Sequence, residues 1–390
     1  MDKQNKRVLI VSGEASGDMY AARLITEMHH LDPSLYFFGM GGDNMRAVGA
    51  HILVDAKDLA VVGIVEVLSK FNVIYSALKK VKTILKKNPP DLVILIDYPG
   101  FNLRIAKMAK QAGVKVLYYI SPQIWAWRKN RIHTLKKYVD WMAVILPFEA
   151  KIYEQAQIPV TFVGHPIVDQ VSPHTLDNSK KPGNRKTICL MPGSRSGEIK
   201  HLLPVILESA NLLKKSYPSL QFLLPLAPTV LLSEIAPYLN HFPELNIQII
   251  QNQTYDAIQS SHAVITASGT ATLEIALLGL PMVIIYKLAP LSYFILKRLA
   301  KINYIGLCNI ISEKCIVPEL IQDDANPEKI TAEIKRFLED AEYRHQTENY
   351  LAEMKIKLGD TGASKKVAGL AMNLLLTNDT PCRIRQPFNQ

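Results

Sequence analysis

The sequence predicts an α/β protein of two doubly wound domains, each a parallel sheet with helices on both faces. Two features of the pattern support this prediction. Apolar runs of strand length alternate with amphipathic segments of helix length, and a polar stretch near the middle interrupts the alternation before it restarts. The length of 390 residues also exceeds what one hydrophobic core usually supports, so two domains are expected.

In the first half, the expected strands are short runs of apolar residues, as in strands that are buried on both faces of a parallel sheet. They start near residues 7, 35, 91, 115, 141 and 160. Amphipathic segments at 74–87 and 103–111 are expected to form covering helices.

A polar stretch at 172–186, "SPHTLDNSKKPGNRK", is almost free of apolar residues and is typical of a linker. We therefore expect a first domain at 1–171 and a second at 187–357. Strands of the second domain are expected to start near residues 187, 220, 246, 262 and 281. The final segment, 358–390, is expected to form a helix, a candidate to cross back to the first domain, and a loose tail.

The positive net charge of the chain predicts an anionic partner. The formal net charge is +10 and the isoelectric point is near 9.2. Nucleic acid, a membrane surface and a phosphorylated substrate all satisfy this requirement, and composition alone does not choose among them.

Cysteine usage and the N-terminal sequence predict a cytoplasmic protein. The cysteines form neither a C-x-x-C pair nor a metal-ligand spacing, as expected in a reducing compartment. They are Cys189, Cys308, Cys315 and Cys382. The apolar run at 8–11 is too short for the core of a signal peptide, and the uncharged stretch at 216–233 contains prolines that argue against a membrane span.

The motif "GEASGD" at 13–18 follows the first expected strand and opens the first expected helix. Its spacing matches neither a hydrolase elbow nor a P-loop nor a dinucleotide fingerprint. Two interpretations remain open. The motif is either a tight turn with a Ser or Asp helix cap, or a site where Glu14 and Ser16 bind a hydroxylated ligand at the helix amino end.

Asp97 ends an expected strand in "LIDYPGFN". A carboxylate at this position is a candidate general base toward a hydroxyl, if its surroundings raise its pKa toward the working pH. The alternative is that Asp97 caps the following helix. No second carboxylate is paired with it in the sequence, so a two-acid glycosidase is not indicated.

A related strand, glycine turn and helix occur in "LMPGSRSGE", now with Ser194 and Arg195 in the turn. The guanidinium group of Arg195 offers a rigid set of donors suited to phosphate. This motif predicts an anion site, and the alternative is a surface arginine in an ordinary turn.

The motif "TASGTATLE" gives the strongest local signal. Its small residues open a helix after a strand and would let a diphosphate approach the helix amino end, while Glu274 could accept from ribose hydroxyls. The small residues are Ser268, Gly269, Thr270 and Ala271. Thr270 and Glu274 are one residue too far apart to form a capping box, which favours the ligand-binding interpretation.

Two stretches combine aromatic and basic residues. They are "YYISPQIWAWRKNR" at 118–131 and "APLSYFILKRLAKINYIG" at 289–306. Both are candidate surfaces for an anionic membrane or a lipid-bearing substrate, although a buried helix with one solvated side also explains much of the second.

His165, in "VGHP", is expected to be structural.

These motifs, and the order in which they occur along the chain, resemble those of the bacterial lipid-A-disaccharide synthases, which are glycosyltransferases of the GT-B architecture. That architecture has two doubly wound Rossmann-like domains facing each other across a cleft. The resemblance rests on "GEASGD", "VVGIVEVL", "LIDYPGFN", "YYISPQIWAWRKNRI", "LPFE", "FVGHP", "LMPGSR", "ASGTATLE" and "NII". The chain departs from the family pattern at Gly100, where related enzymes often carry an Asp, but it keeps Asp97.

The resemblance implies inverting transfer of 2,3-diacylglucosamine from UDP-2,3-diacylglucosamine to 2,3-diacylglucosamine 1-phosphate, which gives the β-1,6 disaccharide of lipid A biosynthesis and UDP. It implies direct displacement without a metal or cofactor. Asp97 or Glu14 would be the base, and Arg195 with residues 268–271 would stabilise the leaving diphosphate. Further site candidates that it implies are Ser16, Glu274, Arg298 and Asn309. A homodimer, bound peripherally to the anionic inner membrane, is also expected.

Two other functions remain as alternatives. Another GT-B enzyme acting on UDP-sugars, such as a UDP-N-acetylglucosamine 2-epimerase, would not need the aromatic surfaces at Trp125, Trp127 and Phe294. A nucleic-acid-binding protein is suggested by charge alone, and no recognised nucleic-acid-binding motif is present in the sequence.

Overall fold

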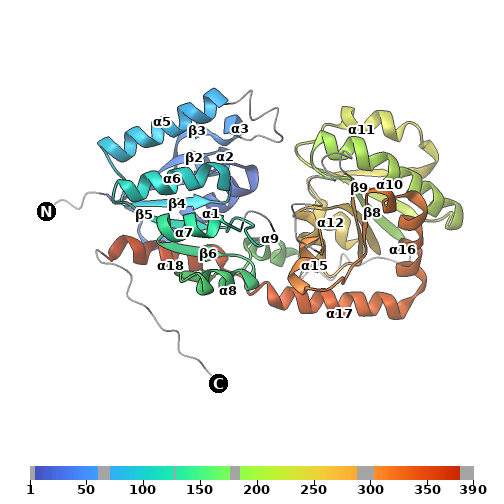
Figure 1. The fold of residues 1–390 in the computed structure, drawn as a ribbon. Helices are drawn as coiled ribbons and strands as arrows, with labels where there is room; N and C mark the ends of the chain where they lie inside the picture. Colours follow the sequence, from blue (N-terminus) through green and yellow to red (C-terminus); the bar gives the residue numbers. More distant parts are fainter. Residues whose placement is uncertain (1–4, 60–70, 127–128, 176–184, 288–302, 378–390) are drawn as a thin grey trace, which may run out of the picture. The chain divides into compact units, whose positions relative to one another are not determined.

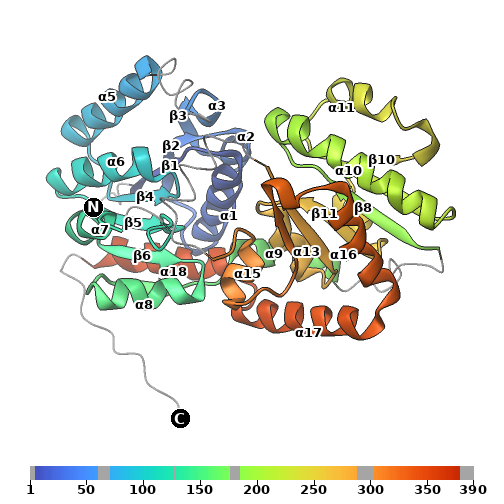
Figure 2. The same cartoon turned by 45° about the vertical axis from the view of Figure 1, so that its right-hand side comes forward.

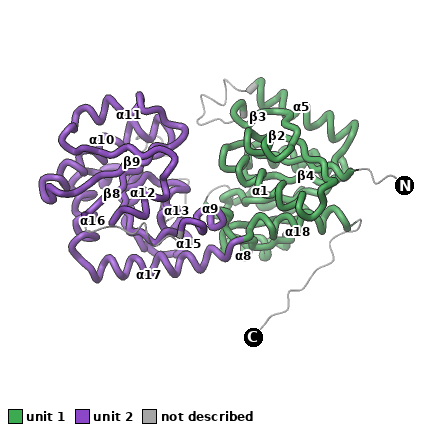
Figure 3. The backbone as a smooth tube through the Cα atoms, turned by 180° about the vertical axis from the view of Figure 1, so that it is seen from behind, with its two compact units in different colours: residues 1–166, 362–390 green, residues 167–361 purple. Residues whose placement is uncertain are grey.

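The computed structural model describes residues 5–59, 71–126, 129–175, 185–287 and 303–377 (Figure 1). The chain forms two compact units, which Figure 3 colours separately. The first contains residues 1–166 and 362–390, and the second contains residues 167–361.

The first unit is built on a parallel sheet in the order β3-β2-β1-β4-β5-β6-β7. Its strands are β1 (Arg7–Ser12), β2 (Tyr36–Gly41), β3 (His51–Asp55), β4 (Leu92–Ile96), β5 (Lys115–Tyr119), β6 (Trp141–Val144) and β7 (Val160–Phe162). All the predicted strands of this half are confirmed. Strand β3, a half-buried strand at the edge of the sheet, was missed, whereas β7 at the opposite edge was predicted.

Helices cover both faces of this sheet (Figures 1 and 3). They are α1 (Ala15–Leu31), α2 (Asp43–Ala47), α3 (Ala56–Leu59), α5 (Phe71–Lys87), α6 (Pro99–Gln111), α7 (Arg131–Tyr138), α8 (Pro147–Gln155) and α18 (Ala363–Leu376). Helices α5, α6 and α7 share a core with one face, and α1 and α18 pack together against the other. The ammonium groups of Lys6 and Lys115 donate to the carbonyl oxygens of Leu375 and Leu374, which ties the end of α18 to this unit.

The second unit is also built on a parallel sheet, in the order β10-β9-β8-β11-β12-β13. Its strands are β8 (Thr187–Met191), β9 (Gln221–Leu226), β10 (Gln248–Gln251), β11 (Ala263–Ala267), β12 (Met282–Tyr286) and β13 (Glu319–Ile321). The predicted strands are confirmed again, and the one that was missed, β13, is a three-residue edge strand.

Helices α10 and α16 share a core with one face of this sheet. Helices α12 and α13 contact its strands, and α13 in turn packs against α15 and α17 (Figure 2 labels α13, α15 and α17). The helices of this unit are α9 (Pro166–Thr175), α10 (Ser196–Ser216), α11 (Leu232–Leu239), α12 (Thr254–Gln259), α13 (Ala271–Leu277), α15 (Leu307–Ser312), α16 (Pro327–Glu339) and α17 (Ala341–Lys357). No helix of the described residues is long and apolar enough to cross a membrane.

The two units divide at Pro166, whereas the sequence placed the end of the first domain at residue 171. Helix α9 accounts for the difference because its polar groups bond to residues of the second unit. Gln170 donates to the hydroxyl of Tyr255, and Gln259 donates to the carbonyl oxygen of His174. Residues 176–184 of the predicted linker lie outside the described residues.

Each sheet has one point where the strand order reverses, and the loops at the carboxyl ends of the two strands there diverge to leave a crevice. In the first unit this point lies between β1 and β4, where Ser12 pairs with Ile96. In the second unit it lies between β8 and β11. The motifs containing Glu14, Asp97, Arg195 and Ser268 directly follow these four strands.

Candidate functional site

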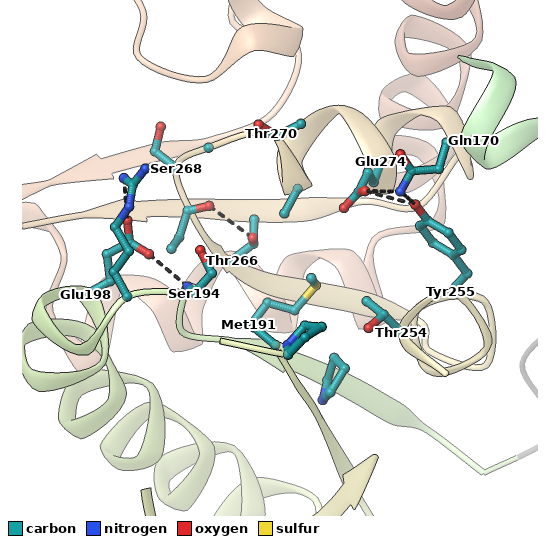
Figure 4. Close-up of a pocket in the computed structure, with 18 of the residues that line it drawn as sticks. Gln170, Met191, Ser194, Glu198, Thr254, Tyr255, Thr266, Ser268, Thr270 and Glu274 are labelled. Carbon is teal, nitrogen blue, oxygen red and sulfur yellow. Dashed lines mark hydrogen bonds and ion pairs between the residues drawn. The ribbon is translucent and has the colours of Figure 1, made fainter. Parts of the chain in front are cut away.

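A pocket of about 540 Å³ lies at the reversal point of the second unit (Figure 4). Loops after β8 and β11 and the starts of α10, α12 and α13 contribute to its walls. It brings together seven of the residues that the sequence selected: Ser194, Arg195, Ser268, Gly269, Thr270, Ala271 and Glu274. That these residues bind a sugar nucleotide stays a prediction.

The turn after β8 is shaped by a glycine and a glutamate. Gly193 has a φ of +115°, and a Cβ atom there would lie 2.3 Å from Oε2 of Glu198. The same Oε2 accepts a hydrogen bond from the backbone N–H of Ser194 at 2.9 Å, while Oε1 lies 3.4 Å from Nη1 of Arg195. Only glycine leaves room for the glutamate to fold back onto the turn.

Arg195 lies at the amino end of α10, a helix of 21 residues. Its side chain is 59% exposed, so the guanidinium group is accessible to a ligand in the pocket. The free N–H groups and the dipole at the start of such a helix attract negative charge. Arginine and helix terminus therefore form a corner of positive character, and that it binds an anion stays a prediction.

At another wall of the pocket, Glu274 is held by two side chains that the sequence analysis did not select (Figure 4). The hydroxyl of Tyr255 donates to Oε1 of Glu274 at 2.9 Å, and Nε2 of Gln170 lies 3.4 Å from the same oxygen. Burial raises the pKa of Glu274, and the bond from Tyr255 opposes that rise. The carboxylate is thus fixed and has acceptor capacity left for hydroxyl groups.

Tyr255 and Gln170 differ in how far the sequence could have revealed them. Tyr255 follows β10 by four residues, so its place beyond the carboxyl end of a strand was a usable signal. Gln170 lies on α9, in a stretch assigned to the first domain, and no pattern marked it as a pocket residue.

Ser268 and Asn309 belong to one network that extends from the pocket wall. The hydroxyl of Ser268 donates to the carbonyl oxygen of Ile305 at 3.2 Å, and the N–H of Ile305 donates to Glu319 at 2.8 Å. Glu319 also accepts from Nδ2 of Asn309 at 2.7 Å.

Asn309 does not line the pocket. It is fully buried, its Nδ2 donates to Val317 and Glu319, and its Oδ1 accepts from the N–H groups of Ile316 and Val317. These bonds give it a structural role beside the site, so a direct contact with a ligand is not supported. Arg298, another predicted site residue, lies outside the described residues.

In the first unit, Asp97 lies at the reversal point with Glu14. Burial and the negative charge of Glu14 raise the pKa of Asp97 to about 6, and the backbone N–H of Tyr98 acts in the opposite direction. The alternative of a helix cap is wrong, because the N-cap residue of α6 is Tyr98. The carboxylate therefore has the raised pKa that the base hypothesis required.

Glu14 and Ser16 are exposed at the start of α1. Glu14 occupies the N-cap position without a side-chain cap bond, so the alternative of a Ser or Asp cap does not hold at this end of the helix. Asp18 is instead buried, at 3% exposure. Its carboxylate accepts from the N–H of Gly42 at 2.5 Å and from the N–H and Nδ2 of Asn44 at 3.0 and 2.9 Å, which pins the loop after β2.

The aromatic stretch before α7 is only partly a surface. Trp125 is half-buried, its ring packs edge-on against Phe148, and its Nε1 donates to Oε1 of Glu149 at 3.2 Å. Burial raises the pKa of Glu149 to about 7. Trp127 and Arg128 lie outside the described residues, as does most of the second stretch, at 288–302.

His165 is buried, and burial lowers its pKa to about 3, so it is neutral and structural, as expected. Across the described parts of the chain, no three His, Cys, Asp or Glu side chains form a group that could hold a metal ion.

The fold of this chain is similar to that of several solved structures. A UDP-GlcNAc 2-epimerase from Neisseria meningitidis matches 94% of this chain and its own whole length with a TM-score of 0.64 at 15% identity. The calicheamicin glycosyltransferase matches 95% of this chain with a TM-score of 0.61 at 14% identity. At such low identities the likeness establishes the GT-B-like fold alone.

Sequence relatives identify the family. The family described as "Lipid-A-disaccharide synthetase" matches residues 8–372. The lipid-A-disaccharide synthase of Geobacter metallireducens is 51% identical over 376 residues, which are 95% of this chain and 98% of that protein. That of Nitrosococcus oceani is 47% identical over 386 residues, which are 96% and 98% of the two chains. The chain therefore belongs to the lipid-A-disaccharide synthases, the glycosyltransferases of lipid A biosynthesis.

Proposed function

We propose that the pocket of the second unit binds the UDP part of UDP-2,3-diacylglucosamine. The observation that carries this proposal is the arrangement of two unlike groups around one pocket. Arg195 at the start of α10 supplies positive charge suited to the diphosphate, and Glu274 supplies a fixed acceptor suited to the ribose hydroxyls. Small residues at 268–271 leave room for the nucleotide between them.

The acceptor, 2,3-diacylglucosamine 1-phosphate, is activated by the first unit. A carboxylate whose pKa is about 6 is still mostly ionised at neutral pH, and it is more basic than an ordinary aspartate. Asp97 can therefore accept the proton of the 6-hydroxyl. Glu14 and Ser16 are exposed and would hydrogen-bond other hydroxyls of the acceptor sugar.

The reaction is a single displacement with inversion. The 6-oxygen of the acceptor forms a bond to the anomeric carbon of the donor as the bond from that carbon to the UDP oxygen breaks. The hydroxyl proton passes to Asp97, and UDP leaves with the bonding electron pair. Arg195 and the amino end of α10 stabilise the charge that develops on the diphosphate.

Incubation with both acylated sugars tests the substrate assignment. Mass spectrometry is expected to detect UDP and the disaccharide 1-phosphate in equal amounts, and nothing when either sugar is omitted. A donor without acyl chains is the control. Equal turnover of that donor, or an epimerised UDP-sugar as the product, would contradict the assignment.

Binding to an anionic membrane surface is the second part of the proposal, because both substrates carry acyl chains. Helix α5 supports it. It has no acidic residue, Tyr75 is 62% exposed near its amino end, and its lysines are exposed. These are Lys79, Lys80, Lys82, Lys86 and Lys87. A basic helix with exposed aromatic residues suits an interface between lipid headgroups and water.

Sedimentation with vesicles is expected to increase with the fraction of anionic lipid and to decrease with salt. Replacing Lys79, Lys80 and Lys82 with Gln should weaken binding to anionic vesicles. The matched control replaces Lys355, Lys357 and Lys365, which are also exposed and helical, and should have less effect. Equal binding to neutral and anionic vesicles at every salt concentration would contradict membrane association of this kind.

A further inference from the structure

We propose that Tyr118 and Asn102 are positioning residues that hold Asp97 in a left-handed backbone conformation and so aim its carboxylate. The inference rests on the proposed role of Asp97 as the base. It assigns a function to two buried side chains that no sequence motif marked as site residues.

The backbone at Asp97 is unusual. Asp97 has a φ of +47°, and Tyr98 has a φ of +46° and a ψ of +56°, so two successive residues other than glycine adopt the left-handed region. This conformation places Cβ close to a carbonyl oxygen and costs free energy at each residue. Such residues persist only where surrounding contacts over-determine them, and they cluster at functional sites.

Three hydrogen bonds hold the main chain of Asp97. Its carbonyl oxygen accepts from the hydroxyl of Tyr118 at 2.7 Å and from Nδ2 of Asn102 at 2.8 Å. Its N–H donates to the carbonyl oxygen of Tyr119 at 3.1 Å. Nδ2 of Asn102 also donates to the carbonyl oxygen of Ile96 at 3.1 Å, so one amide group spans the last residue of β4 and the residue after it.

Tyr118 and Asn102 come from different elements, and both are fully buried. Tyr118 lies on β5, within the core between the sheet and helices α5 to α7, and Asn102 lies in the first turn of α6. A phenylalanine would fill the same core position as Tyr118 without a polar atom to satisfy. The hydroxyl at this position therefore serves the main chain of Asp97 and not the packing of the ring.

The side chain of Tyr98 packs against the loop that follows β1. Its ring lies against Gly13, where an added Cβ would approach Cγ of Tyr98 to 2.4 Å. The left-handed turn thus fits tightly against the loop after β1, which also carries Glu14. Because the direction of the Cα–Cβ bond follows from the backbone angles, releasing this turn would redirect the carboxylate of Asp97 and admit water to it.

The first variant is Tyr118→Phe, which keeps the ring and removes only the hydroxyl. We expect kcat to fall by about 10-fold with little change in KM for either substrate, because misplacing a catalytic group slows the chemical step without changing ground-state binding. Asn102→Ala should lower kcat further. The control is Tyr153→Phe, which removes another buried tyrosine hydroxyl of the same unit, one that bonds to Ser121, and should keep normal turnover.

A pH profile separates positioning from a general loss of stability. The titratable group that shifts the pKa of Asp97 is Glu14, while the charge of Asp97 in turn raises the pKa of the Tyr118 hydroxyl. The wild-type protein should lose activity as the pH falls through about 6, the pKa of Asp97. If Tyr118→Phe lets water reach the carboxylate, its pKa falls, so the acid limb of kcat/KM, which reports the pKa of the free enzyme, should move to lower pH. Tyr153→Phe should leave the limb in place.

The outcomes distinguish this inference from the proposal on which it depends. Normal kcat and an unshifted acid limb in Tyr118→Phe, with an inactive Asp97→Asn, would overturn the positioning role and leave the base assignment standing. An active Asp97→Asn would instead remove the base assignment itself. Equal losses of kcat in Tyr118→Phe and Tyr153→Phe would reduce both tyrosines to structural residues.

Discussion

Replacing Asp97 with Asn is expected to lower kcat by roughly 10²- to 10⁴-fold, the usual range for the loss of a general base. The amide keeps the shape of the side chain but cannot accept the proton of the acceptor hydroxyl. Binding of UDP, which we assign to the pocket containing Arg195, should stay unchanged. Steady-state kinetics with both acylated sugars and calorimetry with UDP measure the two effects on one preparation.

The folded protein should not lose stability through this change. Because the pKa of Asp97 is raised from 3.8 to about 6, its ionisation destabilises the folded state progressively between these pH values and fully above about 6, and a neutral Asn removes that penalty. We therefore expect an equal or higher thermal midpoint at pH 7.5.

Asp91→Asn is the control for the Asp97 variant. Asp91 precedes the same strand at its opposite end, where it accepts from the N–H of Arg7 at 2.7 Å. Its replacement should leave kcat near normal. If Asp97→Asn instead kept normal turnover, the base would have to be sought at Glu14.

Arg195→Ala should weaken UDP binding by about 10- to 100-fold, which corresponds to the loss of ~1.5 to 3 kcal/mol from a charge-assisted hydrogen bond. The affinity should fall because, among the described residues that line the pocket, the guanidinium group of Arg195 is the positively charged one. Isothermal titration calorimetry at fixed ionic strength measures this loss directly. The wild-type affinity should fall as salt is added, and that of the variant should depend on salt less steeply.

A matched arginine controls for net charge. Arg336, on α16 of the same unit, is 52% exposed against 59% for Arg195, and it pairs with Asp340 away from the pocket. Arg336→Ala should keep wild-type UDP affinity. Unchanged affinity in Arg195→Ala would place the diphosphate elsewhere, and equal losses in both variants would point to long-range charge instead of a direct contact.

Most of the fold could be predicted because central strands of a parallel sheet are buried on both faces and therefore appear as continuous apolar runs. The two strands that were missed, β3 and β13, are edge strands without full burial on both faces, whereas the edge strands β7 and β10 were predicted. The places of Asp97, Arg195 and Ser268 could be predicted because ligands of such sheets bind beyond the carboxyl ends of strands.

Residues that support the site could not be found in the same way. Tyr118, inside an apolar run, gives the pattern of an ordinary core position, although its hydroxyl reaches the main chain of Asp97. Gln170 meets Glu274 across 104 residues of sequence. Asn309, selected through family resemblance, uses its amide inside its own loop.

By itself, the sequence determined the family of this protein, the two parallel sheets and the loops that carry the candidate site, because burial periodicity and motif order are properties of the chain. The tertiary structure alone decided three other features. It raised the pKa of Asp97 through burial and the charge of Glu14, turned Asp97 and Tyr98 into the left-handed region, and fixed Glu274 through Tyr255. Each depends on groups that only folding brings within a few ångströms, where desolvation and hydrogen bonding act.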